Sequence, residues 1–335
     1  MCNPLLLRNM PPYVTFSRNV FIPLTNVCRN RCAYCGFRRD IGHPEAKLLS
    51  PEEAAGILSR GARSGCSEAL FTFGERPEEV LGFREWLSDF GYDTIIDYLA
   101  ELCRLSIRTG LLPHSNPGVL EKNELLKLKP YNASMGLMLE TASDIAAHRG
   151  CPGKVPKARI KTIEAAGELG IPFTTGLLIG IGEKREDRVS SIRIIKEIHE
   201  KFGHIQEVII QNFVPKPGTG MASWPSPAMS EMMETISTAR RILPADVAIQ
   251  VSPNLISPKE LIVCGASDLG GISPETIDHI NPECAWPDIY ELRAAIPMRE
   301  RLPIYPRYVK KKWFSEEIAP LMQKLSDPEG FRKTY

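Results

Sequence analysis

The sequence has little net charge and no long run of apolar residues. Its 41 lysine and arginine residues nearly balance its 40 aspartate and glutamate residues, so the formal net charge is +1 at pH 7. This balance provides no field that would attract nucleic acid or an anionic membrane. The longest apolar stretch, 171–181, is interrupted by glycines, a proline and two threonines and is far too short to cross a bilayer. We therefore expect no membrane segment and a small-molecule substrate.

A secretory signal, internal repeats and low-complexity linkers are also missing. The 335 residues, 43% of them hydrophobic, are enough for one large domain or two modest ones with a substantial core. Without a secretory signal, the cysteines favour a reducing compartment, which predicts a cytoplasmic protein. Six of the nine cysteines stand singly, form no metal-like pair and are assigned no role: Cys2, Cys66, Cys103, Cys151, Cys264 and Cys284.

The other three cysteines, Cys28, Cys32 and Cys35, lie together with the spacing C-x3-C-x2-C. Each iron of a 4Fe-4S cluster needs one external ligand, so three thiolates leave one iron open to something other than protein. A structural zinc site usually adds a second C-x2-C or H-x3-H half, which the region 28–66 lacks. A disulfide with a spare thiol would need an oxidising compartment. The pattern therefore predicts an oxygen-sensitive 4Fe-4S cluster with one open iron.

This cysteine spacing resembles that of radical S-adenosylmethionine (SAM) enzymes. The resemblance implies that the amino and carboxylate groups of SAM chelate the open iron, and that reductive cleavage gives methionine and a 5'-deoxyadenosyl radical. A non-catalytic iron-sulfur electron carrier is the alternative. Such carriers usually bind their cluster through four cysteines in a small fold.

From about residue 50 onward, short apolar runs alternate with longer amphipathic stretches, a rhythm that indicates an α/β fold with a parallel sheet. Eight candidate strands fit the (β/α)8 TIM-type barrel of the radical SAM superfamily. The predicted strands are Val20–Leu24, Ala69–Phe73, Leu111–Ser115, Ala133–Leu139, Phe173–Ile179, Glu207–Phe213, Val247–Val251 and Gly265–Leu269.

Helix signals lie between these strands. Ser50 with Pro51 and Glu53 has the pattern of an N-cap, a first-turn proline and a capping box. Further helices are predicted at 93–108 and 156–169, and the proline-rich stretch 215–227 reads as a long loop. We predict two parts of the chain, the barrel over 1–285 and a C-terminal extension packed on it over 286–335.

Functional groups in such a barrel lie where the strands end at their C-termini. The cysteine loop follows the first predicted strand, and Gly74 and Glu75 follow the second. In radical SAM enzymes a Gly-Gly-Glu segment at this place binds the methionine amino group, and here Phe73 replaces its first glycine. The resemblance to biotin synthase and the hydrogenase-maturase radical enzymes implies that Glu140 and Arg159 hold the ribose diol and the carboxylate of SAM.

The fifth predicted strand runs into Gly176-Leu-Leu-Ile-Gly-Ile-Gly-Glu183. This segment is similar to the G-x-I-x-G-x-x-E adenine segment of the superfamily, with Leu178 in place of isoleucine. Glycines there allow a flat base to approach the backbone. The cofactor-binding residues implied by the resemblance are Tyr34, Gly74, Glu75, Ser115, Glu140, Arg159, Gly176 and Gly180.

Five longer segments of the sequence carry a more specific resemblance: 71–78, 114–118, 135–140, 172–176 and 203–213. Together they resemble the family of FO synthases, of the first-subunit type, over roughly residues 15–310. FO is 7,8-didemethyl-8-hydroxy-5-deazariboflavin, the deazaflavin core of coenzyme F-420. Ser252 and the run Ser267–Leu269 differ from the residues usual in that family.

The resemblance implies the second radical step of a two-subunit pathway. A companion subunit joins a tyrosine-derived 4-hydroxybenzyl group to a ribitylaminouracil, and this type of protein closes the central ring of the adduct with loss of ammonia. A low-potential electron donor of the ferredoxin or flavodoxin type is also implied. The companion tyrosine-using subunit, a biotin synthase and a hydrogenase-maturase type enzyme are alternatives. Polar residues at later strand ends are the predicted substrate contacts: His114, Gln211, Asn212, Asn254 and Asp268.

Overall fold

Eight parallel strands close into a barrel in the computed structural model, which describes residues 12–333. Each strand pairs with the next along the chain, and pairing of the first strand with the second and the eighth closes the ring. The strands are β1 (Val14–Ile22), β2 (Glu68–Thr72), β3 (Leu112–Asn116), β4 (Ser134–Gly136), β5 (Phe173–Ile179), β6 (Ile205–Asn212), β7 (Ala248–Gln250) and β8 (Asp268–Ile272).

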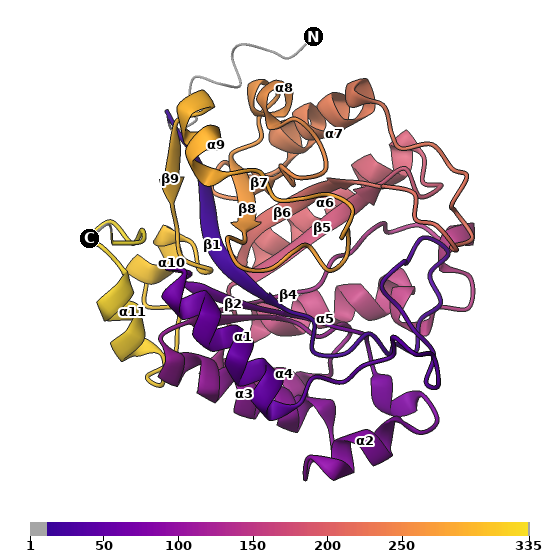
Figure 1. The fold of residues 1–335 in the computed structure, drawn as a ribbon. Coiled ribbons are helices and arrows are strands. Elements are labelled where there is room, and N and C mark those ends of the chain that lie inside the picture. Colours follow the sequence, from indigo (N-terminus) through magenta and orange to yellow (C-terminus); the bar gives the residue numbers. More distant parts are fainter. Residues whose placement is uncertain (1–11, 334–335) are drawn as a thin grey trace.

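Helices cover the outside of the barrel (Figure 1). The capping box at Ser50 is confirmed, because its hydroxyl accepts a hydrogen bond from the Glu53 amide and the Glu53 carboxylate accepts one from the Ser50 amide. The helices that follow the strands are α1 (Pro51–Arg63), α2 (Phe83–Asp89), α3 (Ile95–Thr109), α4 (Lys122–Leu128), α5 (Pro156–Glu168), α6 (Arg185–Phe202), α7 (Met229–Ile242) and α8 (Pro258–Val263).

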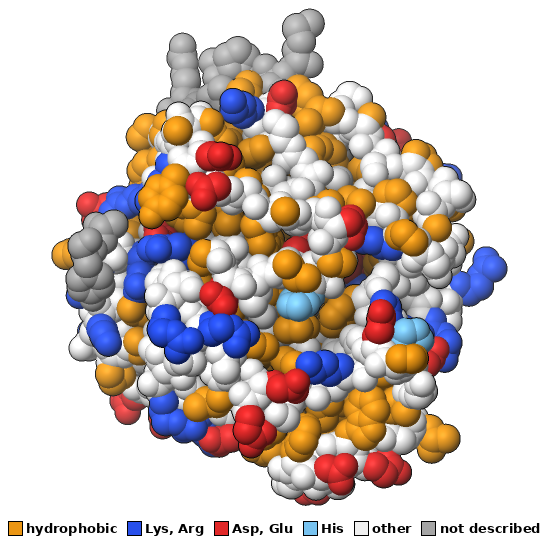
Figure 2. Space-filling model, in the orientation of Figure 1, with side chains coloured by type: hydrophobic (Ala, Val, Ile, Leu, Met, Phe, Trp, Pro, Cys, Tyr) orange, Lys and Arg blue, Asp and Glu red, His pale blue; other side chains and the backbone are white. Residues whose placement is uncertain are grey.

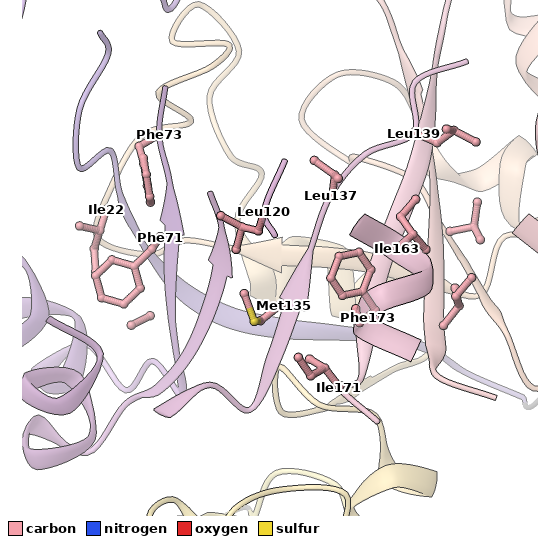
Figure 3. Packing of buried hydrophobic residues seen from close by; sticks show 14 of the residues in the cluster. Ile22, Phe71, Phe73, Leu120, Met135, Leu137, Leu139, Ile163, Ile171 and Phe173 are labelled. Atoms are coloured by element: carbon pink, nitrogen blue, oxygen red, sulfur yellow. The ribbon is translucent and has the colours of Figure 1, made fainter. Parts of the chain in front are cut away.

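The main hydrophobic core lies between the strands and these helices. Outward-facing side chains such as Phe71, Met135 and Phe173 are at most 1% exposed and belong to this layer, part of which Figure 3 shows. The inward-facing side chains are different, because they include the polar residues Asn19 and His114. The strands therefore alternate apolar residues outside with a mixture of polar and apolar residues inside, so that the barrel encloses a cavity with polar side chains in its lining.

Most predicted strands agree with the structure, and β5 agrees at both ends. Two predictions need correction. β1 begins six residues earlier than predicted, at Val14, because its inward positions Thr15, Ser17 and Asn19 are polar and interrupt the apolar run. β8 lies three residues later than predicted, because Gly265, at a φ of +117°, belongs to the turn that follows α8.

The chain after β8 returns to the other end of the barrel. After α9 (Ile289–Ala295), the short strand β9 (Met298–Glu300) pairs in parallel with the first residues of β1. Residues 301–305 then pass across the N-terminal ends of the strands, and α10 (Pro306–Lys310) and α11 (Ala319–Leu325) pack beside them. In Figure 1 these yellow helices lie opposite the indigo loop that follows β1. The barrel thus has an open end at the cysteine loop and a covered end at the C-terminal segment.

Charges of both signs are interspersed over the face shown in Figure 2, as the near-neutral composition predicts. Within residues 12–333, no helix combines the length and apolar character needed to cross a membrane.

Candidate functional site

The three clustered cysteines lie in the loop between β1 and α1, at the open end of the barrel. Cys28, Cys32 and Cys35 are half-buried free thiols, and all three line one cavity. A parallel bridge between Val27 and Arg39 fixes the base of the loop, and the Cys35 amide donates to the Cys32 carbonyl at 3.1 Å. The sequence prediction that this loop follows the first strand is confirmed.

The environment keeps these thiols protonated in the metal-free protein. Burial raises the pKa of Cys28 to about 11 and also raises the pKa of Cys35. Because metal binding requires the thiolate form, the positive charge of bound iron has to favour deprotonation of these thiols. Over residues 12–333, no three such ligands lie close enough for a single metal ion.

The residues that directly follow β2 pack against the cysteine loop, and only glycine fits at the contact. A Cβ atom on Gly74 would lie 1.9 Å from the carbonyl oxygen of Val27 and 2.9 Å from Cβ of Cys28. The Glu75 amide donates to Sγ of Cys28 at 3.2 Å. An amide donor to a thiolate sulfur is typical of cluster-binding loops, so the loop and its neighbour fit a cluster at this position.

The carboxylate of Glu75 is held in an ionised state. Arg29 donates to one of its oxygens at 3.0 Å and the Val119 amide to the other at 3.0 Å, while Arg159 lies 3.6 Å away. Burial acts to raise the pKa of Glu75, but Arg159, Val119 and Arg29 outweigh it and lower the pKa below its usual value. Glu75 thus connects Arg29, the Val119 amide and Arg159 in the wall of the cavity.

Glu140 and Arg159 both line the same cavity, as do the thiols. Glu140 has a left-handed backbone, at a φ of +64°, and its carboxylate accepts a hydrogen bond from Lys154 at 2.6 Å. The Arg159 guanidinium donates to the carbonyl oxygens of Met138 at 2.5 Å and Gly153 at 2.7 Å. The structure therefore brings together a carboxylate and two cations at the mouth of the barrel. Lys154 could not be predicted from the sequence, because it stands in a segment without a recognisable motif.

Tyr34 contacts a residue that sequence reasoning missed. Its hydroxyl lies 3.0 Å from Nε2 of His148, and burial lowers the pKa of His148 to about 4, so that the imidazole is neutral. Cys151, which was assigned no role, places its thiol in hydrogen-bond contact with the thiol of Cys32. This contact lowers the pKa of Cys151 to about 7 and raises that of Cys32. Cys2 lies outside the described residues.

Three of the residues implied for cofactor binding do not line the cavity. Ser115 is buried and donates to Asn132 at 2.7 Å. Gly176 lies against the carbonyl oxygen of Ile209, and Gly180 opens a turn at a φ of +97°. Of this segment Leu178 lines the cavity. The turn is fixed by the Glu183 carboxylate, which accepts hydrogen bonds from the Gly180 and Ile181 amides at 2.8 Å each.

The predicted substrate contacts divide into two groups. His114, Gln211 and Asn212 line the cavity. Asn254 donates to Asp278 at 3.0 Å, and Asp268 is fully buried against Arg301; neither of them lines the cavity.

The cavity has a volume of about 390 Å³ and extends from the cysteine loop to the C-terminal segment. Its inner lining includes Glu68, Glu207 and Arg301, none of which the sequence analysis singled out. The available signal was a charged residue within a predicted strand, as at Glu207. A single cavity therefore connects the three thiols with a charged interior.

Comparisons with known proteins agree with this geometry. The model of the Radical SAM superfamily matches residues 22–195. The chain is 58% identical over 323 residues to the 7,8-didemethyl-8-hydroxy-5-deazariboflavin synthase of Methanosarcina mazei, and the match covers 96% of each chain. It is 53% identical over 326 residues to the protein of the same name from Archaeoglobus fulgidus, covering 96% of this chain and 99% of the other.

A solved structure shows the same fold at low sequence identity. HydG, a maturase of the FeFe-hydrogenase, superposes with a TM-score of 0.72 at 16% identity, covering 96% of this chain and 71% of that one. This likeness supports the barrel architecture alone.

Proposed function

Since this chain belongs to the radical SAM superfamily and, within it, to the family of 7,8-didemethyl-8-hydroxy-5-deazariboflavin (FO) synthases, we propose that it cyclises a preformed adduct with loss of ammonia. The adduct is 5-amino-5-(4-hydroxybenzyl)-6-(D-ribitylimino)-5,6-dihydrouracil. Ring closure joins the phenol ring to the ribityl-bearing nitrogen, the 5-amino group leaves as ammonia, and the adduct loses two further hydrogen equivalents, one as the hydrogen atom that the SAM-derived radical would take and one as a proton and an electron. One observation carries this proposal: the three thiols, Glu140, Arg159 and a deep interior with charged side chains all face one cavity.

The residues at the open end fit a 4Fe-4S cluster with SAM. Cys28, Cys32 and Cys35 would hold three irons, and the backbone at Gly74 and the side chains of Glu140 and Arg159 would hold SAM beside the fourth. When bound, the cluster and SAM together supply hydrogen-atom abstraction by a 5'-deoxyadenosyl radical. A carboxylate suits a ribose diol, and a guanidinium suits a carboxylate. Tyr34, Ser115, Gly176 and Gly180 remain proposed members of the cofactor site.

The protein's part in the reaction is to place the adduct and to exclude water. Holding the reacting atoms in one geometry replaces a bimolecular encounter by an internal one. His114 is suited to this role, because burial, with the Arg301 charge, lowers its pKa to about 4 and keeps the ring neutral. Ser134 donates its proton to the carbonyl of Pro303 at 2.6 Å, so it accepts from Nδ1–H of His114 at 2.6 Å. Nε2 of His114 is therefore a hydrogen-bond acceptor.

The proposal extends to the protein's surroundings. A companion FO synthase subunit supplies the adduct, a low-potential donor of the ferredoxin or flavodoxin type supplies the electron, and both act in the cytoplasm. Asn254 and Asp268 act on the substrate indirectly in this scheme, since each supports a residue nearer the cavity.

The test is an anaerobic assay of the iron-reconstituted protein with SAM, a reductant and the adduct. Deazaflavin fluorescence and 5'-deoxyadenosine are followed together, and both are expected. If only 5'-deoxyadenosine forms, the radical chemistry stands and the adduct is the wrong substrate, and free tyrosine with the ribitylaminouracil is tested next. If neither forms and SAM leaves the cluster spectrum unchanged, the iron-sulfur electron carrier becomes the better description.

A further inference from the structure

The inner end of the cavity is closed by the C-terminal segment. The Arg301 amide donates to the Phe16 carbonyl at 2.7 Å, directly after β9 ends. The carbonyl of Pro303 accepts hydrogen bonds from Ser134 at 2.6 Å and from Gln206 at 3.0 Å. These contacts fix residues 301–305 across the strands. We call the cavity lining formed by Glu68, His114, Glu207, Arg301 and Pro303 the floor.

The floor carries more acidic than basic side chains. Arg301, 3% exposed, donates to Asp268 at 2.7 and 2.8 Å and to Glu207 at 3.1 Å. Glu207 also accepts from Tyr305 at 2.6 Å and from Thr174 at 2.7 Å. One guanidinium therefore already serves two carboxylates, those of Glu207 in the floor and Asp268 outside it, before the other acid of the floor is considered.

That other acid is Glu68, on the opposite part of the barrel wall. It is 6% exposed, lines the cavity, and accepts a hydrogen bond from the Ser17 hydroxyl at 2.5 Å. Burial raises the pKa of Glu68 to about 7, and the Arg301 charge and the Ser17 hydrogen bond offset the burial only in part. A buried carboxyl with so little compensation is costly unless a ligand supplies donors.

A second buried group nearby also lacks a partner. Asn19, 2% exposed, lines the cavity on β1, and its side-chain oxygen has no hydrogen-bond partner among the described residues. Gly271 provides the room for it, because a Cβ there would lie 2.2 Å from the Asn19 amide nitrogen. Glu68 and Asn19 thus both line the inner cavity, and the carboxyl of Glu68 calls for a ligand rich in donors.

The depth of the floor separates it from the cofactor end. β2 runs from Glu68 to Thr72, four residue steps, which at ~3.3 Å per residue is roughly 13 Å along the strand, and Gly74 lies two residues beyond its end. The reacting part of the adduct has to lie near the open end, where the thiols are. The part of the substrate that reaches the floor is therefore a part that does not react.

The parts of the adduct at which no bond forms or breaks are the imide edge of the uracil ring and the ribityl chain. An imide edge of uracil presents two carbonyl acceptors for each N–H donor, and carboxylates repel those carbonyls. A ribityl chain presents four hydroxyls, each of which donates a hydrogen bond to a carboxylate or imidazole acceptor and accepts one from a guanidinium. The floor, with two carboxylates, a neutral imidazole and one guanidinium, matches the polyol better.

We propose that the floor binds the polyhydroxyl chain of the substrate and that Glu68 is the residue that determines this specificity. The inference rests on the proposed function, because it names the part of that substrate held at this end. Glu68 accepts two ribityl hydroxyls there, and His114 accepts another. The radical site and the polyol site are then opposite ends of one barrel.

A binding experiment that needs no turnover tests the proposal. FO and its analogue with a methyl group in place of the ribityl chain are titrated into the anaerobic, iron-reconstituted protein, and deazaflavin fluorescence reports binding. The wild type is expected to bind FO at least about tenfold more tightly, which is ~1.4 kcal/mol. Glu68→Gln is expected to lose most of this preference while its affinity for the methyl analogue stays unchanged.

Glu275→Gln is the matched control. Glu275 also accepts a serine hydroxyl, that of Ser64 at 2.8 Å, but lies outside the cavity beside α1. It should keep the full preference for FO. If Glu68→Gln fails to fold, Glu68→Asp, which withdraws the carboxylate by one methylene, should lose part of the preference.

Equal affinity of the wild type for both compounds overturns the proposal, and so does an equal loss of both affinities in Glu68→Gln. Absence of FO binding to the wild type also overturns it. The adduct assay separates this failure from failure of the proposed function: if deazaflavin forms there, the enzyme assignment stands and only the floor assignment falls.

Discussion

Replacing Arg159 by methionine should destabilise the protein in a pH-dependent way. The guanidinium is 4% exposed and donates to two backbone carbonyl oxygens, those of Met138 and Gly153. Methionine keeps most of the side-chain volume but leaves both acceptors without this donor. Each unsatisfied buried acceptor costs ~1–3 kcal/mol, so we expect the free energy of unfolding to fall by about 3 kcal/mol at pH 7.

The charge of Arg159 adds a pH dependence through Glu75. Burial alone would raise the pKa of Glu75, but Arg159 and the other partners bring it below 4.5. A carboxyl whose folded pKa is depressed stabilises the fold above its unfolded pKa, and this stability is lost as the pH falls through the folded pKa. Arg159→Met removes part of that contribution, so its cost should be largest near pH 7 and smaller below about pH 4.

The assay is urea denaturation of the reduced, cluster-free chain at pH 7 and at about pH 3.5. Arg159→Lys is the control, because it keeps the positive charge but loses the forked geometry, and its cost should change less with pH. A cost of Arg159→Met that is equal at both pH values would refute the electrostatic reasoning. A cost under about 1 kcal/mol at pH 7 would refute the hydrogen-bond reasoning.

Three further predictions concern the cysteine loop and its supports. Cys32→Ser should reduce bound iron to a small fraction of four per chain, whereas Cys151→Ser should keep the iron, because the three-cysteine loop suffices to bind the cluster. The measurement is iron analysis after anaerobic reconstitution. Equal losses of iron in the two variants would make Cys151 a ligand. Gly74→Ala should lower the iron content, and it should lower the free energy of unfolding by ~3 kcal/mol or more, since the added Cβ would meet the Val27 carbonyl oxygen at 1.9 Å. An iron content equal to that of the wild type would show that the loop adjusts without cost. Ser50→Ala should lower stability by ~1 kcal/mol through loss of the N-cap, without affecting iron content, as measured by urea denaturation; no change would mean that water replaces the cap.

The sequence predicted the outer layer of the barrel better than its interior. β5 and the start of α1 were placed correctly because buried strands and capped helices have strong local signals. The beginning of β1 was missed because a strand that lines a polar cavity alternates in character and lacks a continuous apolar run. The local sequence pattern shows whether a residue is apolar or polar, but it does not show whether the side chain faces the inside or the outside of the closed barrel.

The site shows the same division. The cysteines stand close in sequence, so their spacing alone indicated a cluster. Glu68, Glu207 and Arg301 come from three distant parts of the chain, and charged residues are normally assigned to the surface. Only the closed barrel and the returning C-terminal segment bring them together. A periodic pattern in one sequence does not show that residues so far apart along the chain lie close together in the fold.

The closed floor has a consequence for the order of events in turnover. Residues 301–305 block the N-terminal end of the barrel, so a molecule bound at the floor enters past the cysteine loop. SAM occupies that entrance in the proposed complex. We therefore expect compulsory-order kinetics, in which the substrate binds first, SAM follows and closes the entrance, and the deazaflavin leaves last. The 5'-deoxyadenosyl radical would then form only when the substrate already fills the barrel, which limits the side reactions of the radical.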